Sequence, residues 1–478
     1  MIFNQFSFIY LFPIIFIVYY VASFYVKKLH LNNKLNNGLL VCISYLLYAQ
    51  YNVACTLCLF YITLLTYVFA LILDDKQQKK IQKIYIVIGS VLVLLPLALF
   101  KYYNFIAEMV NACFEKMNVA TSYPGINWIV PLGISFYTFQ AIGYLFDVYY
   151  HRIKAERNWL DYMLFVSFFP QIVSGPISKA SDLLPQIKRE RVFSRLQAEK
   201  GLMLFVYGLF LKVMLADRIG MYVDVVLGNY AYQSGTSCLF ASLLYSFQIY
   251  ADFAGYSFMA IGVGKMIGFD LINNFKRPYL SISVTDFWHR WHISLSTWLR
   301  DYVYIPLGGS RCSKARNYVN IALTFLVSGI WHGANWTFIF WGFLHGLLQI
   351  LEKMFGIQQC KSSHVLVHCC RIVVTFLLVS FAWIFFRQPS LYDAWRVIVK
   401  ICTDHGDLYR ASNSDIVFSF VALVSLFVVD LMVEFKGRAL KKWLSKSVTL
   451  RLSLCLLILL ITLWCGVLDS SQFIYAKF

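Results

Sequence analysis

Long apolar windows follow one another along nearly the whole chain, with short polar connections between them. A helix needs roughly 17 to 25 apolar residues to cross about 30 Å of hydrocarbon. This pattern predicts an all-α, polytopic integral membrane protein with about 11 transmembrane helices, besides re-entrant and interfacial ones. The windows lie at residues 6–26, 38–73 (a helical hairpin), 81–103, 129–150, 201–226, 238–267, 317–331, 334–352, 367–386, 415–434 and 450–468.

Two segments depart from this pattern. Residues 164–177 are apolar but contain Pro170, Gly175 and Pro176, and they are too short to cross, which predicts a re-entrant or half-crossing element. Residues 273–316 mix aromatic and basic side chains, which is typical of helices that lie in the membrane interface with their rings at headgroup depth. We expect residues 1–478 to form a single membrane-embedded domain.

Composition and charge agree with this interpretation. Hydrophobic residues make up 59% and charged residues 14% of the chain, whereas soluble domains are about a quarter charged. The net charge of +18 is spread over the connections rather than gathered on one domain. The positive-inside rule explains this distribution better than a nucleic-acid partner does. Basic residues at 27–34, 76–83 and 151–157 then lie inside, which predicts an amino terminus outside.

The cysteines and neighbouring histidines predict no metal site. Cys55 and Cys58 form a single C-x-x-C without a second pair, whereas a closed zinc site takes four ligands, so we interpret both as buried thiols. His364 and His368 are four residues apart and lie near Cys360, but this segment merges into the apolar window that follows.

Two histidine blocks interrupt the apolar sequence, and ionisable residues in membrane segments are usually functional. The second block, S-G-I-W-H-G-A-N-W, places His332 between Trp331 and Gly333, with Asn335 within one helical turn. The small Gly333 lets another group approach, the aromatic rings exclude water, and a neutral imidazole can act as a general base. From the residues alone, a histidine bonded to a backbone carbonyl between helices remains the alternative.

The first block, D-F-W-H-R-W-H-I-S, contains His289 and His292 three residues apart, which predicts that they share one helix face. Asp286 precedes His289 by three residues, and Trp291 and Ser294 flank His292. The pair is either an acid/base unit or a polar face turned toward the lipid headgroups.

Two charged residues add to these candidates. Arg300 begins R-D-Y-V-Y-I-P-L-G-G, where basic residues are suited to a phosphate-bearing donor such as coenzyme A. Asp252 interrupts the window at residues 238–267, and we favour a carboxylate bonded to neighbouring helices over a direct chemical role.

The segment from Asp286 to Gly309 (D-F-W-H-R-W-H-I-S-L-S-T-W-L-R-D-Y-V-Y-I-P-L-G-G), together with S-G-I-W-H-G-A-N-W, resembles the membrane-bound O-acyltransferase family. The similarity is greatest to its bacterial alginate O-acetyltransferase branch, which is related to the teichoic acid D-alanyl transferases. Further matches are P-L-G-I-S-F-Y-T-F-Q from Pro131, F-F-P-Q-I-V-S-G-P-I from Phe168 and Q-I-Y-A-D-F-A-G-Y-S from Gln248, so the resemblance covers residues 129–345.

The resemblance implies a ring of helices around a thinned centre, with a tunnel that links a cytoplasmic acyl donor to an external acceptor. It also implies that His332 is catalytic and that His292 is the second family histidine. His289 stands where many relatives carry arginine, and Phe258 replaces a common acidic residue. The candidate substrate-binding residues are Trp331, Asn335, Asp286, Trp291, Ser294 and Arg300.

We therefore expect a membrane O-acyltransferase in the bacterial inner membrane, surrounded by lipids. It would move an acyl group, first of all acetyl, from acetyl-CoA or another acyl thioester, without a bound cofactor or metal. The expected acceptor is a hydroxyl of an extracytoplasmic polysaccharide, or of an extracytoplasmic acyltransferase partner that passes the group on. Transfer to teichoic acid, peptidoglycan or lipid remains open, as do a transporter, which should show paired halves, and a scaffold of a polymer-synthesis complex.

Overall fold

The computed structural model describes residues 3, 6–30, 33–76, 78–357, 364–445 and 447–467. Regular secondary structure in these residues is entirely helical, which confirms the predicted all-α class. Helices suit such apolar windows because they bond their own backbone groups where lipid offers no partner. Among the described residues, six helices are long and apolar enough to cross a membrane, and the larger number stays a prediction: Ser7–Lys28, Val53–Asp75, Lys79–Lys116, Val365–Arg387, Asn413–Ala439 and Val448–Cys465.

Contacts along the chain define two compact units. The first consists mainly of Ser7–Ser194 with Ile267–Leu271, and the second mainly of Arg195–Met266 with Ile272–Phe478. The expectation of a single domain over residues 1–478 stays a prediction.

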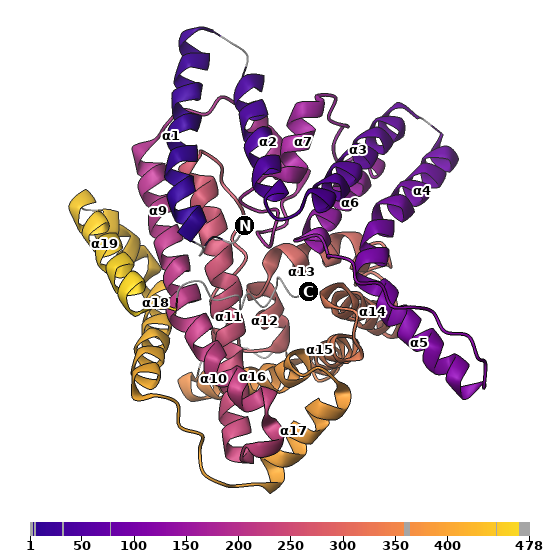
Figure 1. Ribbon diagram of the computed structural model, residues 1–478, viewed down its shortest axis with the longest axis vertical. Coiled ribbons are helices and arrows are strands. Elements are labelled where there is room, and N and C mark those ends of the chain that lie inside the picture. The colour runs from indigo at the N-terminus through magenta and orange to yellow at the C-terminus, as the bar shows by residue number, and fades with distance from the viewer. Residues whose placement is uncertain are drawn as a thin grey trace. The chain divides into compact units, whose positions relative to one another are not determined.

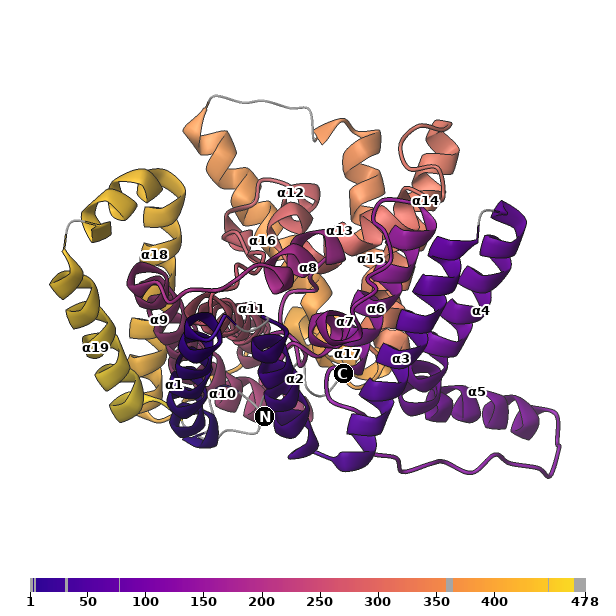
Figure 2. The ribbon, with the colours of Figure 1, turned by 90° about the horizontal axis from the view of Figure 1, so that it is seen from above.

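The first unit contains the predicted helical hairpin, since α2 and α3 are joined by residues 50–52. The chain bends at the π-helical turn η1, and α5 runs off at an angle to α4 (Figure 2). Residues 104–128 begin as helix α5 and then lose regular structure. The elements are α1 (Phe6–Lys28), α2 (Lys34–Ala49), α3 (Val53–Asp75), α4 (Lys79–Leu97), η1 (Ala98–Tyr102), α5 (Tyr103–Lys116), α6 (Ile134–Tyr149), α7 (Trp159–Ser167) and α8 (Ala180–Lys188).

The short element predicted at residues 164–177 is helical only to the end of α7 and then forms buried turns. Side chains stabilise this irregular segment. Gln171 Nε2 donates to Gln140 Oε1 at 3.0 Å, and Ser178 Oγ donates to Gln171 Oε1 at 2.8 Å. The Phe169 backbone N–H donates to Ser44 Oγ at 3.2 Å. Such bonds let a non-helical backbone remain buried in protein, and the re-entrant or half-crossing placement of the segment stays a prediction.

The second unit is built on α9 and α11, which pack side by side along their lengths (Figure 1). The amphipathic helix α17 was not predicted, because it is too short and too polar for an apolar window. The elements are α9 (Arg195–Phe210), η2 (Leu211–Ala216), α10 (Asp217–Gly228), η3 (Tyr230–Tyr232), α11 (Gly235–Met266), η4 (Pro278–Leu280), α12 (Val284–Arg290), α13 (Ile293–Leu299), η5 (Arg300–Tyr304), α14 (Lys314–His332), α15 (Trp336–Met354), α16 (Val365–Arg387), α17 (Leu391–Thr403), α18 (Asn413–Ser445) and α19 (Val448–Cys465).

Residues 273–316 form short helices, but their tryptophan rings are buried in protein, and the predicted headgroup depth stays a prediction. Trp288, Trp291 and Trp298 are buried. Trp291 packs against Trp383 of α16 with ring centroids 5.2 Å apart, and Trp288 packs against Trp341 of α15 at 5.7 Å. The Trp288 and Trp291 rings are therefore part of an aromatic core that they share with α15 and α16.

The hairpin of α14 and α15 depends on two glycines that let the backbones approach closely. A Cβ atom added to Gly329 would lie 2.4 Å from the carbonyl oxygen of Phe338, and one added to Gly342 would lie 2.3 Å from that of Phe325. The backbones of the two helices are therefore in direct contact where the helices cross. This contact fixes the positions of the residues at their joined ends.

We expect Gly342→Ala to lower the free energy of unfolding by about 1–3 kcal/mol, the usual cost of overpacking. The matched control is Gly437→Ala in α18, where no atom lies within 4 Å of the added Cβ. That variant should be neutral or slightly stabilising, since alanine favours helix over glycine by about 1 kcal/mol. Thermal unfolding of the two purified proteins in detergent compares them, and equal transition temperatures would contradict the close approach.

Candidate active site

His292 lies between two short helices rather than on one long helix. Helix α12 ends at Arg290, Trp291 is extended, and His292 adopts φ 43° and ψ 53° at the start of α13. The prediction that His289 and His292 share a helix face is therefore wrong, and His289 is exposed whereas His292 is fully buried. Neither helix is long enough to span a bilayer. Burial lowers the pKa of His292 to about 3, so its imidazole is neutral at pH 7.

Asn274 is the physical reason for the break. Its backbone oxygen accepts from the Ile293 N–H at 3.0 Å, and its Oδ1 accepts from the Ser294 N–H at 2.9 Å. Two N–H groups at the start of α13 are thus bonded to a buried residue far back in the chain. The left-handed conformation of a non-glycine residue costs free energy and is often found at functional sites. Sequence analysis missed Asn274, since no pattern in its segment indicates this contact.

His332 is the last residue of α14 and is buried. The Trp331 ring lies 4.9 Å from the His332 ring and 5.8 Å from the His292 ring, measured between centroids. The two histidines predicted to be functional are thus brought together, with the Trp331 ring beside both. The small Gly333 does admit another group, because the Phe338 ring occupies the space that a Cβ atom would need.

A third buried histidine, His345 of α15, belongs to the same cluster and was missed by sequence analysis. Trp288 Nε1 donates a hydrogen bond to His345 Nδ1 at 3.2 Å. The Trp341 ring lies 5.0 Å from the His332 ring and 4.9 Å from the His345 ring. An ionisable residue inside an apolar helical window was the signal that could have found it.

The remaining candidates near His292 differ in their surroundings. Trp291 is part of the buried aromatic core. The Ser294 hydroxyl is buried and has no hydrogen-bond partner among the described residues. Asp286 Oδ1 accepts from Arg290 Nε at 3.0 Å, and Arg290 also pairs with Glu434 of α18 at 3.1 Å. Asp286 therefore belongs to an ion-pair network that holds α12 against α18.

Asn335 and Arg300 do not join the histidine cluster. Asn335 caps α15, since its Oδ1 accepts from the Thr337 N–H at 3.0 Å and its Nδ2 donates to the Pro389 oxygen at 2.8 Å. These bonds connect the start of α15 with the end of α16. Arg300 is exposed and pairs with Asp301 at 2.8 Å. A direct role for either with the substrate stays a prediction.

Asp252 is bonded to another helix, as the favoured interpretation expected. Lys212 Nζ of η2 lies 2.7 Å from Asp252 Oδ1 and 2.6 Å from Asp217 Oδ1, and all three side chains are buried. Cys55 and Cys58 are buried free thiols, as predicted. Cys360 lies outside the described residues, and within them no group of three or more metal-binding side chains is found.

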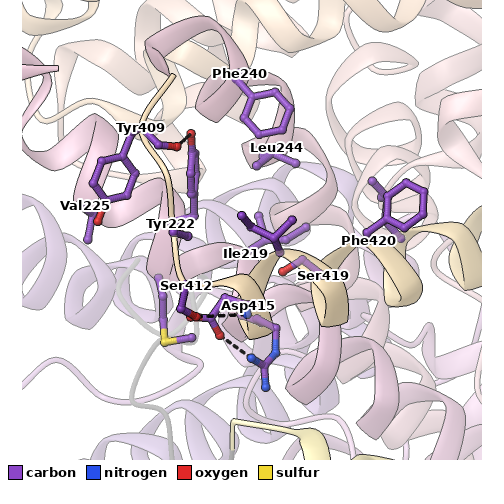
Figure 3. Close-up of a pocket in the computed structure, with 15 residues that line it drawn as sticks. Ile219, Tyr222, Val225, Phe240, Leu244, Tyr409, Ser412, Asp415, Ser419 and Phe420 are labelled. Carbon is purple, nitrogen blue, oxygen red and sulfur yellow. Dashed lines mark hydrogen bonds and ion pairs between the residues drawn. The ribbon is translucent and has the colours of Figure 1, made fainter. Parts of the chain in front are cut away.

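The second unit also has a hollow of about 300 Å³ bounded by α10, α11 and α18. Apolar side chains such as Phe240 and Leu244 line most of it (Figure 3). Asp415 at its edge pairs with Arg218 and accepts from Ser412 Oγ at 2.6 Å. The lining includes no histidine and none of the predicted site residues, so the candidate active site is the histidine cluster.

Comparison with known proteins agrees with the motifs. The model of the membrane-bound O-acyltransferase family matches residues 153–388. The chain is 38% identical over 400 residues, 83% of its length, to a probable alginate O-acetylase AlgI of Pseudomonas syringae pv. tomato, of which the match covers 74%. It is 34% identical over 425 residues to a peptidoglycan O-acetyltransferase of Helicobacter pylori, covering 83% of this chain and 79% of that protein. A teichoic acid D-alanyltransferase of Streptococcus thermophilus is 32% identical over 274 residues, 54% of this chain and 61% of that protein.

The helical membrane fold and the two histidine motifs thus define an acyl-transferring membrane enzyme. The chain belongs to the membrane-bound O-acyltransferase family, and it is a multi-pass membrane O-acetyltransferase. The matched residues 153–388 extend beyond the predicted core of 129–345 toward the carboxyl terminus. They therefore include Trp383 and Phe386 of α16, which pack against the histidine cluster.

Proposed function

We propose that the enzyme transfers an acetyl group from a cytoplasmic thioester, acetyl-CoA in the simplest case, to a hydroxyl of an extracytoplasmic acceptor. The observation that carries this proposal is the pairing of two buried histidines beside one tryptophan ring, at the joined ends of helices from distant parts of the sequence. His332 acts as the general base that takes the proton of the acceptor hydroxyl. The neutral His292 orients donor or acceptor. No bound cofactor or metal is required.

The charge pattern of the second unit supports a direction for this transfer. Residues 311–316 and 353–371 contain basic but no acidic residues. The described parts of these segments, residues 311–316, 353–357 and 364–371, lie at one end of the unit, because α14 begins there, α15 ends there, and Arg371 near the start of α16 donates to the Ile357 oxygen at 3.1 Å. By the positive-inside rule, this end faces the cytoplasm.

Two of the basic residues at the opposite end are paired with aspartates. Arg387 lies 2.5 Å from Asp224, and Lys400 lies 3.7 Å from Asp404. His332 ends α14 on this side, so the proposed base lies toward the outer face, where the acceptor would arrive. A similar argument applies within the first unit. The basic end of α1 and the basic connection of α3 to α4 share one side with Arg157. By the positive-inside rule, this arrangement supports an amino terminus outside an inner membrane.

The acceptor we favour is a cell-envelope polysaccharide, since the related proteins are named for alginate and peptidoglycan. We further propose that the acetyl group reaches it directly or through a separate extracytoplasmic acyltransferase. Teichoic acid is the runner-up acceptor, because the D-alanyltransferase match is shorter.

The test is release of free thiol from acetyl-CoA by the purified protein, with and without a cell-envelope fraction that supplies acceptor and partner. We expect release that depends on the envelope fraction, with label from [¹⁴C]acetyl-CoA appearing in polysaccharide. Release without polysaccharide labelling would overturn the proposed acceptor. Absence of release with acetyl-CoA, while another acyl thioester reacts, would overturn the proposed donor.

A further inference from the structure

Two buried N–H groups on α15 have no acceptor in the part of the chain that the structure describes. They belong to Trp341 and His345, whose side chains are fully buried. The residues are four positions apart, so they share one face of the helix, and their ring centroids are 4.9 Å apart. A buried donor without an acceptor costs free energy, so each such group in a native protein calls for an explanation.

The protonation of His345 follows from its partner. Because its Nδ1 accepts a hydrogen bond from Trp288 Nε1 at 3.2 Å, a neutral imidazole must carry its proton on Nε2. The Nε2–H is the group without an acceptor. Glu352, on the same helix, accepts from the Thr285 N–H at 3.0 Å and from the Thr285 hydroxyl at 2.8 Å, which holds the start of α12 against α15. Trp288 is thus held in place to fix the His345 ring.

Trp341 places one of these donors beside the proposed base. Its indole lies 5.0 Å from the His332 ring at an interplanar angle of 88° and stacks on Trp383 at 5.5 Å. The stacked rings leave Trp341 little freedom to move, and the surroundings are apolar. A hydrogen bond to a charged oxygen is worth more in such a site than in water, and the donor needs no reorganisation during reaction.

We infer that the Trp341 indole N–H and the His345 Nε2–H donate hydrogen bonds to the acyl carbonyl oxygen of the thioester during transfer. This inference rests on the proposed function. His332 takes the proton of the acceptor hydroxyl, whose oxygen bonds to the carbonyl carbon, and the carbonyl electron pair moves to the oxygen that the two N–H groups stabilise. When the carbonyl re-forms, the carbon–sulfur bond breaks, and the thiolate leaves with the proton from His332. The products are an O-acyl ester and a free thiol.

The first test uses Trp341→Phe, which removes the N–H and keeps an aromatic ring. We expect kcat for acetyl transfer from acetyl-CoA to fall about 10²–10³-fold, the usual effect of losing one such donor, with KM for acetyl-CoA little changed. The smaller ring leaves space in the core and should lower the unfolding temperature, but this loss of packing would not by itself lower kcat of the folded protein. Trp395→Phe on α17 is the control, since Trp395 is exposed and should leave both quantities unchanged.

The second test separates donation by His345 from packing. His345→Gln can still accept from Trp288 and donate through its amide, so it should keep kcat within about tenfold, whereas His345→Phe should lose about 10²-fold or more. A structural role would instead lower the unfolding temperature of both variants and leave kcat of the folded protein unchanged. That result, or wild-type kcat in Trp341→Phe, would overturn the inference.

A spectroscopic measurement does not depend on turnover. In His332→Ala, the carbonyl stretch of bound [1-¹³C]acetyl-CoA should shift to lower frequency than in solution, and adding Trp341→Phe should remove part of that shift, the rest coming from the His345 donor. An unchanged shift in the double variant would overturn the inference alone. If wild-type protein releases no thiol from acetyl-CoA with the envelope fraction, the proposed function itself fails, and the inference fails with it.

Discussion

Replacing His332 by alanine should lower acetyl transfer by about 10²- to 10⁴-fold, the range expected for loss of a general base. The reason is positional as well as chemical. His332 is buried among Trp331, Trp341 and Phe386, with ring centroids 4.9–5.2 Å away. Water in such a site is a poor substitute for the missing base. The measurement is the rate of thiol release from acetyl-CoA with the envelope fraction, normalised to folded protein.

The control comes from the other histidine block. His289→Ala removes an exposed imidazole and should leave the rate unchanged. His332→Gln tests whether hydrogen bonding alone is sufficient. It keeps a side chain of similar size without a base, so it should be as inactive as alanine. Near wild-type turnover in either His332 variant would refute the general-base role, and equal losses in His289→Ala and His332→Ala would indicate nonspecific damage.

Hydropathy predicted most of the fold because long apolar helices are fixed by a local property, the need to bond the backbone in lipid. It failed where distant segments decide the conformation. The sequence H-R-W-H is compatible with a helix. However, Asn274 accepts hydrogen bonds from the two backbone N–H groups that follow His292, and the helix is interrupted there. The aromatic residues of α12 and α13 have interface composition, yet their burial depends on α15 and α16, which composition does not reveal.

The site was predicted in part for the same reason. His332 and His292 were found because they stand in motifs with recognisable neighbours, and the structure adds that one ring, Trp331, lies beside both. His345 and Lys212 were missed, since each is a single polar residue within an apolar run. The physical signal was present, because a lone ionisable residue at such a position must have a buried partner. Its partner was not predictable, since Trp288 and Asp252 come from other elements.

Lys212→Met should be the most destabilising of the substitutions considered. We expect it to lower the free energy of unfolding by about 3–5 kcal/mol. Lys212 bonds Asp217 and Asp252 at 2.6 and 2.7 Å, and removing the cation leaves two buried carboxylates facing an apolar side chain. The helices cannot separate to admit water without losing their packing. The backbones are already in close contact here, because a Cβ atom added to Gly255 would lie 2.7 Å from the backbone oxygen of Gly208 and 3.1 Å from the backbone nitrogen of Lys212. Chemical or thermal unfolding in detergent measures the change.

The matched control is Arg157→Met, which breaks pairs with Asp75 at 3.0 Å and with Asp74 at 3.6 Å and, because Arg157 is exposed, should cost no more than about 1 kcal/mol. Combining Lys212→Met with Asp217→Asn and Asp252→Asn removes all three charges and should restore much of the lost stability, because the cost comes from unpaired charge. A Lys212→Met variant as stable as Arg157→Met would refute this account.

The Asp252→Asn variant also separates the two interpretations of that residue. If Asp252 only stabilises the crossing of α11 with η2, turnover per folded molecule stays at the wild-type value, whereas a chemical role would lower it even in the charge-free combination.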